Sequence, residues 1–130
     1  MNYYITTTIE ETFENSISKV TEELKKQGFG IITQIDMKET LKKKLDVDFK
    51  KYTILGACNP SFAYKALQVE EKIGTMLPCN VIIIEKSEHS TEVSAINPMV
   101  SMQTVNNPLL HELGAQVSSS LEKMIEALKS

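Results

Sequence analysis

The sequence predicts one α+β domain over residues 1–130, with a single mixed, mainly antiparallel sheet and its helices largely on one face. Three observations support this prediction. Apolar residues recur at helical spacing in 13–24 and 110–128, and residues 81–84 form an uninterrupted apolar run of strand length. Only the last two predicted strands are separated by a hairpin-length connection. The chain length fits one domain with an ordinary hydrophobic core.

The chain is predicted to begin with a strand followed by an amphipathic helix. Residues 3–8 alternate in character and are rich in β-branched side chains, which favours a strand. Thr8 and Glu11 have the spacing of a capping box, in which each side chain bonds the other residue's backbone amide. The helix then carries the stripe 13–24 and is expected to end near Gly28.

A second strand and a short lysine-rich helix are expected next. Residues 29–36 alternate in a way that predicts a strand, and Met37, Leu41 and Leu45 define a short helix. The surrounding lysines and acidic residues predict a solvated face with a local net charge of only +2, six lysines minus four acids. They are Lys38, Lys42, Lys43, Lys44, Lys50 and Lys51, with Asp36, Glu39, Asp46 and Asp48.

The middle of the chain is predicted to form strand, turn and helix in close succession. Residues 52–57 predict a strand that enters a turn at Asn59. Asn59 is a favourable N-cap and Pro60 suits the first helical position, where no amide donor is needed. Apolar spacing from Phe62 onwards predicts a helix that stops at Gly74.

The second half is predicted to form a hairpin and a long final helix. The run 81–84 is typical of a strand covered on both faces. A polar turn over 86–91 and a strand over 92–96 would complete the hairpin, which Asn97-Pro98 ends. After a polar connection, the last helix is expected to run from Leu110 to Leu128, where its apolar stripe ends.

Composition and charge exclude several broad classes of protein. The chain is 42% apolar and 24% charged, which argues against disorder. Its net charge is −3, with fourteen lysines and no arginine, which counts against nucleic acid as the main partner. No secretory signal and no apolar run of about 20 residues is present, so the expected location is cytoplasmic, with no membrane partner and with reduced thiols.

Two short motifs resemble those of a known family. The run GFGIITQIDMKETLKKKLDVDFKKYTILGACNPSFAYKALQVEEKIGTMLPCNVIIIE, followed by AINP, resembles the bacterial and archaeal domain-of-unknown-function family numbered 302. The resemblance implies a TATA-binding-protein-like fold, with a curved sheet, a long C-terminal helix and a homodimer, but no activity. The matching positions are Gly56, Ala57, Cys58, Asn59, Pro60, Leu77, Pro78, Cys79, Asn80 and Pro98.

The preferred hypothesis is a ligand-binding module. The sheet and the long helix would enclose a pocket whose mouth is formed by two turns: Cys58, Asn59 and Pro60 in one, Pro78, Cys79 and Asn80 in the other. Backbone amides after Asn59 would hold an anionic or carbonyl group of a small molecule, because the first amides of a helix lack partners. No cofactor is indicated.

Two alternatives remain open. A thiol beside a helix N-terminus is favoured as thiolate, so Cys58, with Cys79 as its partner, would suit redox chemistry. If both sulfurs meet, Met99 or Met102 would complete a site for a soft ion such as Cu(I) rather than Zn(II). The other alternative is a purely structural or dimerisation domain, with both cysteines as small buried apolar residues.

No recognisable catalytic constellation accompanies these motifs. His89 falls in a predicted turn and His111 near a helix start, so each is expected on the surface. The sequence has no nucleophile elbow and no glycine-rich phosphate loop, and no carboxylate pair has the spacing for acid–base work. Whether the chain is an enzyme is therefore left undecided.

Overall fold

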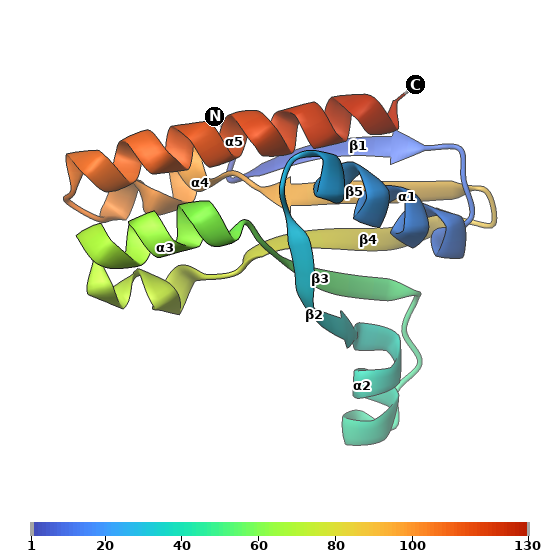
Figure 1. Cartoon of the computed structure of the whole chain (residues 1–130). Helices are drawn as coiled ribbons and strands as arrows, with labels where there is room; N and C mark the ends of the chain where they lie inside the picture. Colours follow the sequence, from blue (N-terminus) through green and yellow to red (C-terminus); the bar gives the residue numbers. More distant parts are fainter. Residues whose placement is uncertain (1, 130) are drawn as a thin grey trace.

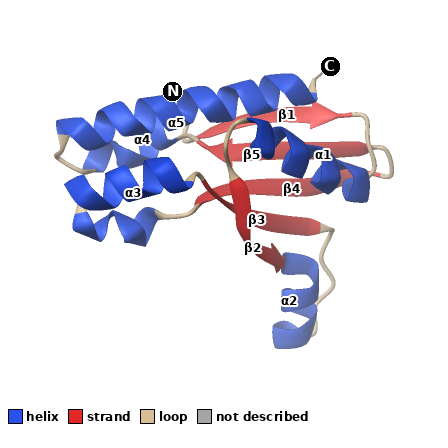
Figure 2. Cartoon of the chain, viewed as in Figure 1, coloured by secondary structure: helices blue, strands red, loops and turns tan. Residues whose placement is uncertain are grey.

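The computed structural model describes residues 2–129, which form one five-stranded sheet with helices packed on it (Figures 1 and 2). The strand order is β1-β5-β4-β3-β2, and every pairing between these strands is antiparallel. The elements are β1 Tyr4–Ile9, α1 Phe13–Lys26, β2 Gly30–Asp36, α2 Met37–Leu45, β3 Tyr52–Cys58, α3 Pro60–Val69, the 3₁₀ helix η1 Glu71–Met76, β4 Cys79–Ser87, β5 Ser90–Ile96, α4 Pro98–Ser101, the 3₁₀ helix η2 Met102–Thr104 and α5 Pro108–Leu128.

The core lies between the sheet and the two helices α1 and α5. Val20 and Leu24 of α1 and Leu121 of α5 are fully buried against the strand residues Val81 and Ile83. Both helices therefore bury the apolar stripes that the sequence shows, and they cover the same face of the sheet. The predicted α+β fold with its long C-terminal helix is confirmed, although the sheet is antiparallel throughout rather than mixed.

The predicted capping box before α1 is wrong. Thr8 lies inside β1, opposite Glu92 of β5, so it remains part of the sheet. The N-cap is instead Thr12, whose side-chain oxygen accepts from the Asn15 amide at 3.2 Å. Glu11 pairs with Lys19 at 3.2 Å. Because Thr8 and Ile9 pair with β5, the strand continues beyond the residue at which the local pattern predicts the helix cap. The helix therefore begins four residues later, after Thr12.

The helix expected to run to Gly74 ends earlier. α3 stops at Val69, Glu70 takes an extended backbone, and η1 follows. The cause is tertiary: the side-chain amide of Asn107 donates to the Val69 carbonyl at 2.8 Å and to Glu70 Oε1 at 3.3 Å. This contact satisfies the helix end.

The connection before the last helix contains structure that the sequence pattern does not show. α4 and η2 occupy part of the segment predicted as an irregular polar connection. α5 begins at Pro108, two residues before the predicted start, because Asn107 caps it by accepting from the Leu109 and Leu110 amides. Pro108 takes the first helical position, as Pro60 does in α3 and Pro98 in α4.

The central strand β4 is covered by helices on one face only. Val81 and Ile83 face α1 and α5 and belong to the main core, whereas Ile82 and Ile84 lie on the opposite face and outside it. On that second face Ile84 is only 7% exposed and Ile82 is half-buried, so the predicted cover of both faces is present only in part. No helix within residues 2–129 is both long and apolar enough to cross a lipid bilayer.

Candidate functional site

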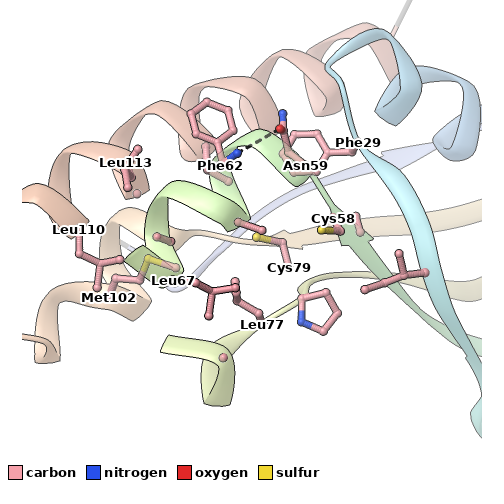
Figure 3. A pocket seen from close by; sticks show the side chains of 18 residues that line it. Phe29, Cys58, Asn59, Phe62, Leu67, Leu77, Cys79, Met102, Leu110 and Leu113 are labelled. Carbon is pink, nitrogen blue, oxygen red and sulfur yellow. Dashed lines mark hydrogen bonds between the residues drawn. The ribbon is translucent and has the colours of Figure 1, made fainter. Parts of the chain in front are cut away.

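A pocket of about 350 Å³ lies where α3 and α5 meet the adjoining ends of β3 and β4 (Figure 3). Its buried floor includes Met102, Leu110 and Val117, while Leu67 and Ile32 lie at its exposed side. Among the described residues that line it, none carries a charged side chain. The pocket is therefore an apolar space with very few polar groups.

Strand pairing brings the two predicted turns together. In the β3–β4 register Ala57 lies opposite Cys79, and Cys58 follows as the last residue of β3. Figure 3 shows both cysteine side chains among those lining the pocket, with Asn59 beside them. Of the six residues predicted to form the mouth, Cys58, Asn59, Pro78 and Cys79 line the pocket; Pro60 and Asn80 are exposed and lie outside its lining.

Asn59 caps α3 and uses up most of the amides expected to bind an anion. Its side-chain oxygen accepts from the Phe62 amide at 3.3 Å, and its carbonyl accepts from the Ala63 amide at 2.9 Å. Pro60 has no amide hydrogen, and Ser61, the remaining residue of the first turn, is exposed and lies outside the pocket lining. This local arrangement favours an apolar ligand over a strongly anionic one.

Gly28 permits the close approach of Asn59. Its backbone has φ +85°, a conformation that glycine adopts without strain, and it ends α1. A Cβ at this position would lie 3.0 Å from Asn59 Nδ2. The predicted end of the first helix therefore also shapes one side of the site.

The two thiols differ in burial. Cys58 is half-buried and Cys79 is buried, and neither forms a disulfide. Burial, and secondarily the charge of a Cys58 thiolate, raises the pKa of Cys79 to about 11. Cys79 is therefore a protonated thiol at neutral pH and a poor nucleophile.

Alkylation is expected to distinguish the two cysteines. At pH 7.5 iodoacetamide should modify Cys58 in the folded protein at least about tenfold faster than Cys79, because burial withholds Cys79 and thiolate is the reacting form. Mass spectrometry of digested samples would measure both rates, with urea-unfolded protein as the control. Equal rates in the folded protein would contradict this assignment.

The same pKa shift predicts a loss of stability at alkaline pH. The folded-state pKa of Cys79 lies above its unfolded value, so the folded state holds the proton more tightly. Its contribution to stability is complete below the unfolded pKa, about 8.5, and is lost as pH rises toward about 11. The Cys79→Ala variant should therefore lose less stability than the original chain as pH rises from about 8.5 to about 11.

The residues proposed for a soft-metal site are only partly brought together. Met102 is buried and lines the pocket with Cys58 and Cys79, whereas Met99 is 36% exposed and does not line it. Within residues 2–129 no group of three or more His, Cys, Asp or Glu side chains is arranged to hold a metal ion. His111 Nε2 lies 2.6 Å from the Val105 carbonyl, which gives it a structural partner.

The sequence analysis predicted that the long helix helps to enclose the pocket, but it named none of the α5 residues that line it. Leu110, Leu113, Gly114 and Val117 line it, far in sequence from the two turns. One feature could have pointed there: Gly114 interrupts a helix interior, where glycine is unfavourable. A Cβ at Gly114 would lie 3.2 Å from the Pro98 carbonyl oxygen, so the glycine allows α5 to pack closely on α4.

Comparison with known proteins gives a family but no activity. The model of the family described as Domain of unknown function DUF302 matches residues 5–128. An uncharacterized protein of Aquifex aeolicus (strain VF5) is 27% identical over 82 residues, 61% of this chain but only 57% of that protein. The crystal structure of an uncharacterized conserved protein DUF302 from Bacillus stearothermophilus has a TM-score of 0.91 at 25% identity, covering 99% of this chain and 100% of that one.

Proposed function

Because the chain belongs to the family called domain of unknown function DUF302, whose name supplies no activity, we propose its function from the pocket: it binds a small, mainly apolar molecule between α3 and α5. The supporting observation is the 350 Å³ space whose lining contains no charged side chain. Pockets of this character, apolar with a few polar groups, are typical of small-molecule sites.

The volume limits the size of the ligand. An apolar cavity of about 150 Å³ holds benzene, so this pocket, at about 350 Å³, suits a molecule with the bulk of two aromatic rings or a medium-length hydrocarbon chain. Burial of roughly 200 Å² of apolar ligand surface would contribute on the order of 5 kcal/mol before the cost of association. Met102 in the floor adapts readily to different shapes, because its side chain is flexible.

Polar recognition would be confined to the mouth. The Asn59 side-chain amide is a donor there, which suits one carbonyl or hydroxyl oxygen. A multiply charged ligand is disfavoured, because none of the described lining residues carries a compensating positive charge.

Blocking the pocket is expected to weaken the binding of small apolar molecules. Ala63 lines the pocket and is half-buried, so Ala63→Trp should place an indole ring inside it. The binding of indole and of decanol, measured by calorimetry and by ligand-induced thermal stabilisation, should weaken at least about tenfold relative to the original chain. The matched control is Lys65→Trp, on an exposed position of the same helix, and it should bind normally. Failure of the original chain to bind either compound, or unchanged binding by Ala63→Trp, would contradict the proposal.

A thiol-dependent function is the second candidate, and one specific observation favours it: Cys58 and Cys79 line the same pocket from adjacent strands. Replacing both by serine separates the two candidates. An apolar binding site should still take up indole in the double variant, whereas redox or soft-metal function should be lost. Native mass spectrometry of the protein from its own cells would show whether any retained species depends on sulfur.

A further inference from the structure

Two thiols belong to the wall of the apolar pocket. Cys58 is half-buried, Cys79 is only 8% exposed, and both side chains line the pocket (Figure 3). Cys79 Sγ forms neither a disulfide nor a hydrogen bond with another residue in the range 2–129. A buried polar atom without a partner in the protein is available to a ligand. The pocket therefore offers a ligand two sulfur atoms, one that solvent reaches and one that is enclosed.

The other lining residues limit the chemistry of these thiols. Among the described residues that line the pocket, none is a lysine, so a carbonyl ligand would not be held there as an imine. None is a histidine or a carboxylate that could act as the general base of an acyl transfer. A leaving group that departs as an anion would meet no compensating positive charge. Addition to a carbon–carbon double bond needs none of these groups.

Cys58 is the thiol suited to react. Thiolate is the nucleophile, and burial raises the pKa of Cys79 to about 11, so Cys79 keeps its proton at neutral pH. Cys58 is reached by water, which can take up its proton, and its side chain still lines the pocket. A molecule held in the pocket would therefore lie against one thiol that ionises and one that does not.

A conjugated carbonyl group matches the polar part of the site. Asn59 follows Cys58 directly and lines the same pocket, and its side-chain amide donates to one oxygen atom. A carbonyl oxygen accepts such a bond, and conjugation with a double bond makes the β-carbon of the ligand electrophilic. The rest of the ligand would be apolar, as the lining requires.

Building on the proposed function, we propose that the pocket takes apolar α,β-unsaturated carbonyl compounds and that Cys58 binds them covalently. The Cys58 thiol gives its proton to water, and its sulfur forms a bond to the β-carbon of the ligand. The carbon–carbon π bond breaks, and its electron pair moves toward the carbonyl oxygen to form an enolate. Water then returns a proton to the α-carbon. The product is a thioether, and the reaction needs neither an oxidant nor a leaving group.

The reaction rates of two electrophiles test this inference. Benzylideneacetone is apolar and acrylamide is small and polar, but both add to thiols by conjugate addition. Each rate with the protein is divided by the rate with N-acetylcysteine at the same pH, and mass spectrometry of digested samples identifies the modified residue. The normalised rate of benzylideneacetone at Cys58 should exceed that of acrylamide at least about tenfold, because the pocket holds the reacting carbon beside the sulfur.

Matched compounds and variants show whether the pocket causes this preference. Benzylacetone has the same skeleton without the double bond, so it should slow the addition of benzylideneacetone by competition. Cys58→Ser should form no adduct in the pocket, and Ala63→Trp should lose the preference because its indole ring fills the space. Lys65→Trp and Cys79→Ser should keep the preference. Circular dichroism establishes that each variant is folded, and the comparison of rates in the original chain requires no variant.

Indole binding separates this inference from the proposed function on which it rests. If indole binds to the original chain but the two normalised rates are equal, this inference is overturned and the apolar binding site stands. The same conclusion follows if benzylacetone does not slow the addition, or if the adduct forms at Cys79. If neither indole nor benzylacetone binds, the proposed function is overturned and this inference with it.

Discussion

Replacing Gly56 with alanine is expected to lower the free energy of unfolding by about 3 kcal/mol, as measured by equilibrium urea denaturation. Gly56 is buried in β3, opposite Asn80 of β4 and Thr33 of β2. A Cβ there would collide with Thr33 Oγ1 and lie 2.7 Å from Pro78 Cγ. The threonine side chain can rotate away, but the proline ring is stiff and must move with its backbone.

Gly30 provides the matched control. It lies in β2, and a Cβ built there meets nothing within 4 Å, so Gly30→Ala should change stability by no more than about 0.5 kcal/mol. Adding Thr33→Ala to Gly56→Ala should restore only part of the loss, because the contact with Pro78 remains. Equal stability of the Gly30→Ala and Gly56→Ala variants would show that the three strands are not packed as described. Since Pro78 lines the pocket, Gly56→Ala should also weaken indole binding.

The parts of the fold with strong local periodicity could be predicted from the sequence. The α1 stripe and the α5 stripe each recur over several turns, so the direction of their buried faces is set by the residues themselves. The turn residues Asn59 and Pro60 likewise fix the start of α3 by local chemistry, and the structure confirms Asn59 as its cap. The signals at Asn59 and Pro60 place Cys58 and Asn59 at the start of α3, where both line the pocket.

The remaining features depend on contacts between distant residues. α3 ends where Asn107, 38 residues from Val69, donates to the Val69 carbonyl, and no local pattern near Val69 reports that bond. The long helix was expected to enclose the pocket, but which α5 residues line it depends on how α5 packs beside α3, which is a property of the whole topology. The difference in cover between the two faces of β4 is also a tertiary property, since a run of apolar residues does not say what covers each face.

The junction of β5, α4 and α5 depends on one buried polar group, Asn97. Its side-chain oxygen accepts from the Ser118 hydroxyl at 2.7 Å and from the Met99 amide at 3.2 Å, and its Nδ2 donates to the Asn2 carbonyl at 3.3 Å. Asn97 is 6% exposed and Ser118 fully buried. The Ser118 hydroxyl and the Asn97 side chain therefore rely on each other as hydrogen-bond partners. Both are buried, so water cannot replace a partner that is removed.

Asn97→Leu is therefore expected to destabilise the protein by about 2–3 kcal/mol, mainly because the buried Ser118 hydroxyl is left without its acceptor, while the Met99 amide keeps its bond to Ser118 Oγ at 2.9 Å. Urea unfolding measures the loss, and Asn106→Ala at an exposed position is the control, with a change within about 0.5 kcal/mol. Ser118→Ala should cost less, about 1–2 kcal/mol, because the Met99 amide keeps Asn97 as an acceptor. The two single losses should not add in the double variant, because both single changes remove the same hydrogen bond and only the double change takes both acceptors from the Met99 amide. Strict additivity would mean that the two side chains and the Met99 amide do not act as one group, and that α4 is held against α5 mainly by packing around Gly114.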